Sequence, residues 1–252
     1  MAPINTSRFR NKSMIRFDNL KGVVLDIEGT TCPLDFVVNS LFPYARQALP
    51  RFVAEHRQDP KLSALWEEVE QAITAEIATD APQEIADYLQ WLIDQDRKFT
   101  PLKDLQGLIW QQGYNSGSLV APLFDDVESA LKTWHQQGLI LAVYSSGSIA
   151  AQQLLYGNSI AGDLRGLFTS WFDTRLGSKV NSQSYIDLAK HLAIPAAKLL
   201  FISDAPDELK AAKNAGLQVC GSQRPGNIQI INEDSYKTIK KFSELELTNA
   251  LS

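Results

Sequence analysis

The sequence has few of the side chains that bind zinc or build disulfide frameworks. Its 252 residues include two cysteines, Cys32 and Cys220, and three histidines, at positions 56, 135 and 191. The cysteines can form one disulfide at most, which argues against a disulfide-stapled secreted scaffold and fits a reducing cytosol. The scattered histidines have no zinc-ligand spacing. A metal bound by oxygen, such as Mg²⁺, stays open because Asp and Glu are plentiful.

Long apolar runs and excess positive charge are also missing. No stretch approaches the roughly 20 apolar residues that span a bilayer, so we expect no membrane segment. Lys and Arg total 24 against 29 for Asp and Glu, a net charge of -5, which argues against a nucleic-acid-binding surface. A small anionic substrate is not excluded, because a pocket can be basic inside an acidic protein.

The first 22 residues begin with a basic segment. Arg8, Arg10, Lys12 and Arg16 precede the first acid, Asp18. This composition is compatible with an organellar transit peptide, but the segment is short and its amphipathic pattern is poor. We therefore interpret it as a flexible leader in front of a cytoplasmic protein.

Short apolar runs alternate with helical patterns along most of the chain. Continuous apolar runs of this kind are typical of parallel strands buried on both faces, and they occur at 22–25, 139–144, 199–202 and, more weakly, 217–220. Helical periodicity occurs at 127–137, at 182–192 with Ser182 as the cap, and at 206–215. The alternation predicts an α/β fold with a doubly wound parallel sheet.

One interval lacks strand signals and shows only helical periodicity. From residue 39 to 117 the apolar residues recur at helical spacing, as in Leu62, Leu65, Trp66 and Val69. We predict that 18–38 and 118–252 form the α/β core domain, and that 39–117 form an inserted all-helical cap, or lid, domain.

Polar residues follow three of the predicted strands, and a lysine precedes the last of them. They are Asp26 with Glu28, then Ser145 with Ser146, then Lys179, then Asp204. Each has an ordinary structural alternative. Asp26 suits a turn, Ser146 and Asp204 suit caps of the helices that follow them, and Lys179 suits a solvated surface.

Together, these residues indicate phosphate chemistry. Two carboxylates from separate strands can hold Mg²⁺, and a carboxylate nucleophile can form an aspartyl-phosphate. Hydroxyl and backbone N–H groups can bind phosphate oxygens, while a lysine stabilises developing negative charge. The sequence therefore predicts a Mg²⁺-dependent phosphate-ester hydrolase in which Asp26 attacks phosphorus.

The same residues carry a family resemblance. The run Val24-Leu25-Asp26-Ile27-Glu28-Gly29-Thr30, then Ser145-Ser146-Gly147, Lys179, and Asp204 with Glu208 resembles the motif set of haloacid-dehalogenase-like hydrolases. Most phosphatases of that superfamily have Asp where this chain has Glu28. Asp-x-Glu-Gly-Thr is similar to the acireductone-forming enolase-phosphatases of methionine salvage, as are Leu105-Gln106-Gly107 and Arg224-Pro225-Gly226-Asn227.

The resemblance implies a bifunctional enzyme. It would enolise 2,3-diketo-5-methylthiopentyl-1-phosphate and then remove phosphate to give 1,2-dihydroxy-3-keto-5-methylthiopentene. It implies catalytic roles for Asp26 and Glu28, substrate binding by Ser145, Ser146 and Lys179, and one Mg²⁺ per subunit held by Asp26, Glu28 and Asp204. We expect a cytoplasmic monomer that acts on a small phosphorylated molecule, with no nucleic-acid or membrane partner.

Several alternatives stay open. Glu28 can reach the metal through its carboxylate or its backbone carbonyl, and can serve as acid or as enolisation base. Glu208 suits an outer metal shell or a solvated first helical turn. In the cap, Arg97, Lys98 and Lys103 are candidate substrate-facing charges, whereas Trp91, Phe99 and Trp110 suit either a methylthio pocket or the cap core.

Two other functions compete with the enolase-phosphatase interpretation. A generic sugar-phosphate or nucleotide phosphatase of the same fold would use the same residues, and only its substrate range would differ. A catalytically idle binding module is disfavoured, because both Asp26 and Asp204 are present.

Overall fold

The computed structural model describes residues 14–76, 79–228, 231–232 and 234–249. The chain divides into two compact units. An α/β unit takes the described parts of 1–31, 125–144 and 167–252, and a helical unit takes 32–124 and 145–166. The boundaries that the sequence suggested for a core and a cap domain stay a prediction.

The α/β unit is built on a six-stranded parallel sheet with the strand order β4-β3-β2-β5-β6-β7. Its strands are β2 (Gly22–Leu25), β3 (Ile140–Tyr144), β4 (Ser170–Phe172), β5 (Leu199–Ser203), β6 (Gln218–Ser222) and β7 (Thr238–Ile239). The doubly wound parallel sheet is thus confirmed. From β2 the chain runs to β3 and β4 on one side of the sheet, whereas β5, β6 and β7 follow on the other side. Open α/β sheets bind ligands at such a point, where the strand order reverses.

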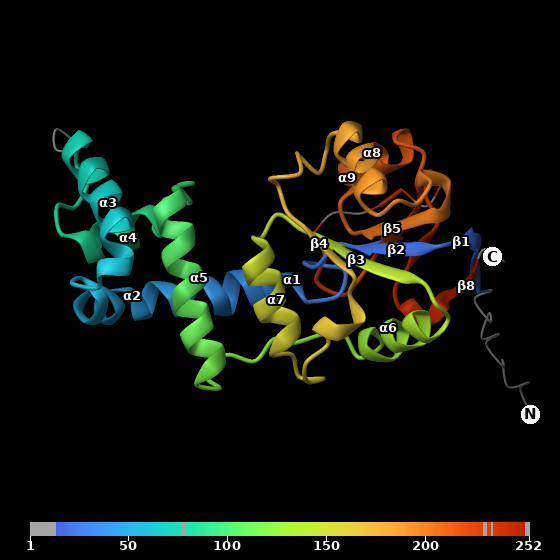
Figure 1. Cartoon of the computed structure of the whole chain (residues 1–252), viewed down its shortest axis with the longest axis horizontal. Coiled ribbons are helices and arrows are strands. Elements are labelled where there is room, and N and C mark those ends of the chain that lie inside the picture. The colour runs from blue at the N-terminus through green and yellow to red at the C-terminus, as the bar shows by residue number, and fades with distance from the viewer. Residues whose placement is uncertain (1–13, 77–78, 229–230, 233, 250–252) are drawn as a thin grey trace, which may run out of the picture. The chain divides into compact units, whose positions relative to one another are not determined.

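Helices cover both faces of this sheet (Figure 1). They are α6 (Val127–Gln136) on one face, and α8 (Ser182–His191) and α9 (Pro206–Asn214) on the other. Two single 3₁₀ turns, Ala196–Lys198 and Phe242–Glu244, connect elements of this unit. The observed helices start at the predicted residues, but the predicted cap of α8 is wrong. Asn181, not Ser182, accepts the capping hydrogen bond, from the N–H of Gln183.

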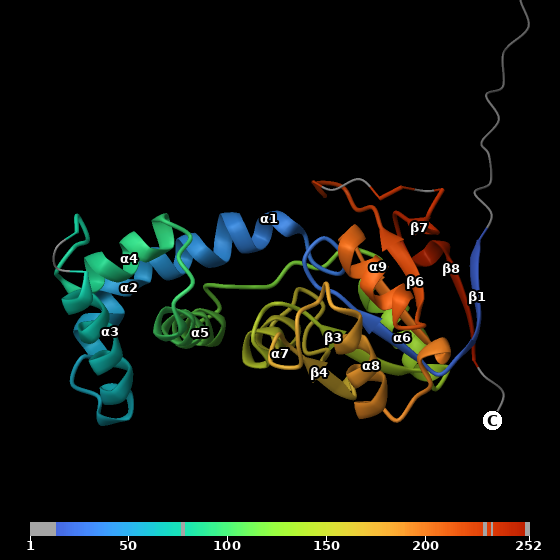
Figure 2. The same cartoon turned by 90° about the horizontal axis from the view of Figure 1, so that it is seen from above.

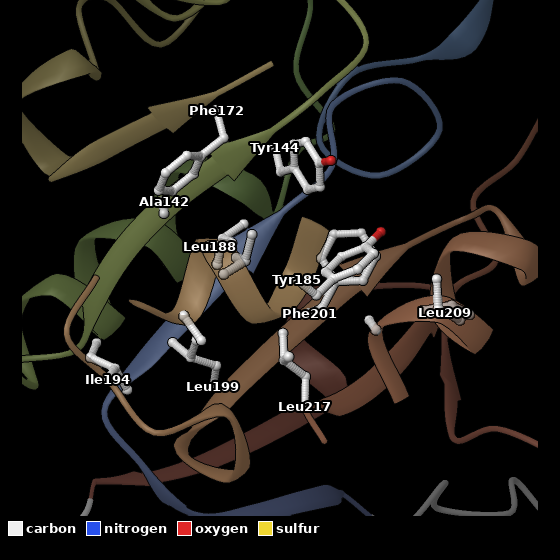
Figure 3. Close-up of a cluster of buried hydrophobic side chains, with 14 of the residues drawn as sticks. Ala142, Tyr144, Phe172, Tyr185, Leu188, Ile194, Leu199, Phe201, Leu209 and Leu217 are labelled. Atoms are coloured by element: carbon white, nitrogen blue, oxygen red, sulfur yellow. The ribbon is translucent and has the colours of Figure 1, made fainter. Parts of the chain in front are cut away.

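Alternate residues of the buried strands fill the core on the α8 and α9 side (Figure 3). Val24, Ala142 and Phe201 belong to a cluster that includes Tyr185 of α8 and Leu209 of α9. Because successive strand residues point to opposite faces, the intervening residues of the same strands are buried on the face that α6 covers. Burial on both faces explains why these strands are continuous apolar runs.

A separate two-stranded parallel sheet joins the two ends of the described chain. β1 (Ile15–Leu20) pairs with β8 (Leu245–Asn249), and they lie side by side in both views (Figures 1 and 2). The interpretation of the first 22 residues as a flexible leader is therefore wrong for residues 15–20. Arg8, Arg10 and Lys12 lie outside the described residues.

The helical unit contains no strand among its described residues 39–117, as predicted. Its longer helices are α2 (Phe42–His56), α3 (Ser63–Ala75), α4 (Ile85–Asp94), α5 (Thr100–Asn115) and α7 (Ile149–Gly157). Short turns are α1 (Leu34–Phe36), the π-helical Val37–Leu41, and a 3₁₀ segment at Pro60–Leu62. A further 3₁₀ turn, Arg165–Leu167, spans the sequence boundary between this unit and the α/β unit. Leu49, Trp66, Leu89 and Leu105 share its main core. In the part of the chain that the structure describes, no helix has the length and apolarity needed to cross a membrane.

Candidate active site

Asp26 lies directly after β2, at the carboxyl end of a central strand of the sheet. Its backbone N–H donates to the carbonyl of Ile202 on β5 at 3.0 Å, so the sheet register extends through this residue. The residue is only 4% exposed. A buried carboxylate needs partners, because desolvation disfavours its charge. A turn role therefore does not account for Asp26.

Lys179 is the main partner of Asp26. Its Nζ lies 2.5 Å from Oδ1 of Asp26 and 2.8 Å from Oε2 of Glu208. The lysine is 8% exposed, so its interpretation as a solvated surface residue is wrong. The ammonium group therefore joins a carboxylate that follows β2 to one on α9.

Two buried tyrosines fix the backbone that carries Lys179. The hydroxyl of Tyr185 donates to the carbonyl of Lys179 at 2.8 Å, and that of Tyr144 donates to the carbonyl of Gly177 at 2.9 Å. Ser184 adds a third bond, to the carbonyl of Ser178 at 2.8 Å. Burial raises the pKa of Tyr185, so it stays a hydrogen-bond donor at neutral pH. Lys179 thus extends from a rigid segment.

Glu208 belongs to the same network. Ser203 Oγ lies 2.9 Å from Glu208 Oε2 and 3.4 Å from Asp26 Oδ2, and it accepts the N–H of Ala205 at 3.1 Å. Because the hydroxyl has one proton, the shorter distance favours donation to Glu208. A solvated acid in a first helical turn is therefore not what the structure shows.

The concentrated carboxylates shift one another's protonation. Burial, followed by the charge of Asp26, raises the pKa of Asp204 and of Glu208 to about 7 each. Burial alone would lower the pKa of Lys179, but the charges of Asp26 and Glu208 outweigh burial and raise it. The lysine is therefore cationic, and the negative charge around it is only partly neutralised.

Asp204 approaches the backbone of the loop after β2. A Cβ placed on Gly29 would stand 2.3 Å from Asp204 Oδ2, and the φ of Gly29 is +70°, so only glycine fits here. Asp204 is not the cap of α9, because the capping position is Ala205 and makes no side-chain cap bond. The short distance to Gly29 places the Asp204 carboxylate against the Asp26–Gly29 loop.

The Arg224–Asn227 segment holds that same loop. Arg224 Nε donates to the carbonyl of Thr30, and Asn227 Nδ2 donates to the carbonyl of Gly29, each at 3.0 Å. Ser222 Oγ donates to the Gly29 carbonyl as well, at 3.0 Å. The sequence indicated this segment only through the family resemblance. The spacing gave no sign of its role, since the contacts join residues almost 200 positions apart.

Ser145 and Ser146 follow β3, the neighbour of β2 in the sheet. Ser145 Oγ accepts the N–H of Gly147 at 3.1 Å, and Ser148, not Ser146, caps α7 by accepting the N–H of Ala151. These two serines fall in the helical unit. Their role in substrate binding stays a prediction, and so do the roles predicted for Glu28, a half-buried residue.

The oxygen atoms of the side chains near Gly29 suit a hard cation. No group of three or more His, Cys, Asp or Glu side chains among the described residues forms a complete ligand set. Mg²⁺ suits such a site, because it typically takes one or two carboxylates and keeps several waters. Asp26 and Asp204 are carboxylates of this kind, and burial, followed by the charge of Asp26, raises the pKa of Asp204.

In the helical unit, the aromatic side chains whose role was open pack as core. Trp91, Phe99 and Trp110 lie against its main hydrophobic cluster, and Trp110 Nε1 donates to the carbonyl of Leu41 at 2.8 Å. Arg97 pairs with Glu76 at 2.7 Å. These contacts support structural roles for the four side chains.

The sheet is doubly wound and parallel, and a buried aspartate follows a central strand, with a lysine and a second acid beside it. This combination defines a class of protein. The chain is a haloacid dehalogenase-like hydrolase: the sequence profile of that family matches residues 20–216. Within this class it belongs to the enolase-phosphatase E1 family. It is 56% identical to Enolase-phosphatase E1 of a Synechococcus species, over 87% of this chain and 91% of the relative.

Solved structures share the fold of this chain. The crystal structure of the UTR4 protein of Saccharomyces cerevisiae has a TM-score of 0.74 at 33% identity, and the match covers 90% of this chain and all of that one. A magnesium-bound haloacid-dehalogenase hydrolase, YfnB of Bacillus subtilis, has a TM-score of 0.53 at 14% identity over 90% of this chain and 96% of its own. The second likeness shows the fold alone.

Proposed function

We propose that this protein is an acireductone synthase of methionine salvage. It converts 2,3-diketo-5-methylthiopentyl-1-phosphate to 1,2-dihydroxy-3-keto-5-methylthiopentene and phosphate. The observation that carries the proposal is the buried Asp26 at the end of β2, paired with Lys179 in a chain of the enolase-phosphatase E1 family.

In the phosphatase half-reaction, Asp26 is the nucleophile. Lys179 engages Oδ1, which leaves Oδ2 to attack phosphorus. The new Oδ2–P bond forms as the bond from phosphorus to the substrate's C1 oxygen breaks, and that oxygen takes up a proton. Water then attacks the phosphorus of the aspartyl-phosphate, which releases phosphate and restores the Asp26 carboxylate. The Lys179 ammonium stabilises the charge that develops on phosphate oxygens.

Asp26, Asp204 and Glu28 would hold one Mg²⁺ per subunit, Glu28 through its carboxylate or its backbone carbonyl. When bound, the ion supplies positive charge that lets an anionic carboxylate approach an anionic phosphate. Glycine at position 29 allows the Asp204 carboxylate to reach the metal site, because any side chain on residue 29 would collide with that carboxylate.

In the enolase half-reaction, a base removes a proton from C1, the carbon next to the diketone, and the C2 carbonyl oxygen takes up a proton to give the enol. Glu28 is the acid or base that we assign to the reacting centre, two residues after the nucleophile. Ser145 and Ser146 would bind the substrate through their hydroxyl and backbone N–H groups. The protein would act as a cytoplasmic monomer on this small molecule.

The test uses purified protein and the diketone phosphate. We expect the absorbance of the enol and free phosphate to appear together with Mg²⁺, to stop with EDTA, and to return when Mg²⁺ is added in excess. Release of phosphate from many sugar phosphates and nucleotides without any enol signal would favour the generic phosphatase instead. Full activity in rigorously metal-free buffer would contradict the metal assignment.

A further inference from the structure

Asn227 has one amide atom that its hydrogen bonds leave unused. Nδ2 donates to the carbonyls of Gly29 and Ser222, each at 3.0 Å, which engages both of its protons. The amide orientation follows from this arrangement, because the nitrogen and not the oxygen must face two carbonyl oxygens. Oδ1 is buried and has no hydrogen-bond partner among the described residues.

A buried acceptor without a donor is unfavourable. Leaving it unsatisfied costs ~1–3 kcal/mol, and such atoms are usually satisfied by water or a bound ion's hydration shell. No other side chain in the described part of the chain supplies that donor. The position of Oδ1 therefore indicates what approaches it.

Oδ1 and the Asp204 carboxylate both lie close to Gly29. A Cβ built on Gly29 would stand 2.9 Å from Asn227 Oδ1 and 2.3 Å from Asp204 Oδ2. Both oxygens thus border one small volume beside the loop that carries Asp26 and Glu28. Two acceptors on the same volume suit one water that donates to both, and a water on Mg²⁺ is a strong donor.

We infer that Asn227 is a positioning residue of the magnesium site. Its Nδ2 holds the Gly29 carbonyl, and therefore the loop, while its Oδ1 accepts a hydrogen bond from a water of the bound ion. The inference rests on the Mg²⁺ site proposed above. It extends that site to the loop that follows β6. This loop contains none of the residues predicted to be catalytic, to bind substrate or to bind the metal.

The test compares two substitutions that remove a donor to the same carbonyl. Asn227→Ala removes Nδ2 and Oδ1, whereas Ser222→Ala removes only the Ser222 hydroxyl that also donates to Gly29. Titration calorimetry of each protein with MgCl₂, without substrate, gives the dissociation constant for the ion. Near-UV circular dichroism checks the fold. Asn227→Ser replaces the alanine variant if that variant loses the parent's spectrum.

We expect Asn227→Ala to weaken Mg²⁺ binding by ~10-fold or more, the usual effect of removing an outer-shell partner, and Ser222→Ala to weaken it much less. Unchanged affinity in Asn227→Ala would overturn the inference. Equal weakening in both variants would assign the effect to the hold on Gly29 and overturn the role of Oδ1. If the parent does not bind Mg²⁺ at all, the proposed metal site itself is wrong, and this inference with it.

Discussion

Lys179 Nζ lies 2.5 Å from Asp26 Oδ1, although the two residues are 153 positions apart in the sequence. The same ammonium group lies 2.8 Å from Glu208 Oε2, so one buried cation joins two carboxylates. Neutralising the lysine leaves both carboxylates buried without a counter-charge. Lys179 is therefore expected to be needed for stability as well as for catalysis.

Replacing this lysine tests both roles. Lys179→Met keeps the length of the side chain but leaves Asp26 and Glu208 without a counter-charge. We expect phosphate release to fall by at least ~100-fold and the free energy of unfolding to fall by about 3 kcal/mol, the lower end for a broken buried pair. Urea unfolding at pH 8 in metal-free buffer measures the second quantity.

A double-mutant cycle supplies the control. Because Glu208→Gln removes one of the two stranded charges, Lys179→Met with Glu208→Gln should lose less stability than the sum of the single variants. Additive losses would mean that the two residues do not interact in solution.

Gly29→Ala should disrupt the metal site through a collision. The new Cβ would stand 2.3 Å from Asp204 Oδ2, and the φ of +70° adds backbone strain. Gly117→Ala is the matched control, since Gly117 has a φ of +73° and open space around it. We expect each variant to lose about 1 kcal/mol from strain, but only Gly29→Ala to lose Mg²⁺ binding. Normal Mg²⁺ affinity in Gly29→Ala, by calorimetry, would contradict the placement of Asp204.

The stability of the metal-free protein should depend on pH. The pKa values of Asp204 and Glu208 are raised to about 7 from ordinary values of 3.8 and 4.5, by burial and by the charge of Asp26. Between about pH 4 and 7 the native state therefore binds more protons than the unfolded state. Its free energy of unfolding falls as pH rises through this range, by at most ~1.4 kcal/mol per pH unit for each carboxyl.

Urea unfolding at several pH values checks this slope. The variant that combines Asp204→Asn with Glu208→Gln is the control, because it cannot titrate at these two positions. A parent and a control with equal slopes would show that the two carboxyls have ordinary pKa values.

The central strands could be predicted from the sequence, and the peripheral ones could not. β2, β3 and β5 are buried on both faces, so each is a continuous apolar run that can be recognised without a partner. β4 has three residues and β7 has two, which is too short for any periodic pattern. β1 and β8 pair with each other although they lie near opposite ends of the described chain, and local sequence does not encode that pairing.

The site divides in a similar way. Asp26 and Asp204 are recognisable because they follow recognisable strands. The ion pair from Lys179 to Glu208 was not predictable, because it depends on how the segment before α8 packs against α9. Arg224 and Asn227 act through backbone carbonyls, which leave no signature in residue type or spacing.

Glu28 is best tested by separating the half-reactions. Asp26→Asn should stop phosphate release and accumulate the phosphorylated enol, because enolisation needs a base but no nucleophile. If the Glu28 carboxylate is that base, Glu28→Gln should slow enol formation by ~10²-fold or more as well as phosphate release. Time-resolved absorbance with a phosphate assay measures both. Enol formation at the parent rate in Glu28→Gln would instead favour Lys179 or a metal-bound water as the base.

The most direct test of the central claim traps phosphate on Asp26. The protein, with Mg²⁺ and substrate, is quenched in acid during turnover and reduced with borohydride, which converts an acyl phosphate to an alcohol. Peptide mass spectrometry should then find homoserine at position 26 in the parent, and none in Asp26→Asn or in protein without substrate. Homoserine at another acid would contradict Asp26 as the nucleophile. So would the absence of homoserine from a sample quenched during turnover at low pH, a condition chosen to make breakdown of the phosphoenzyme rate-limiting.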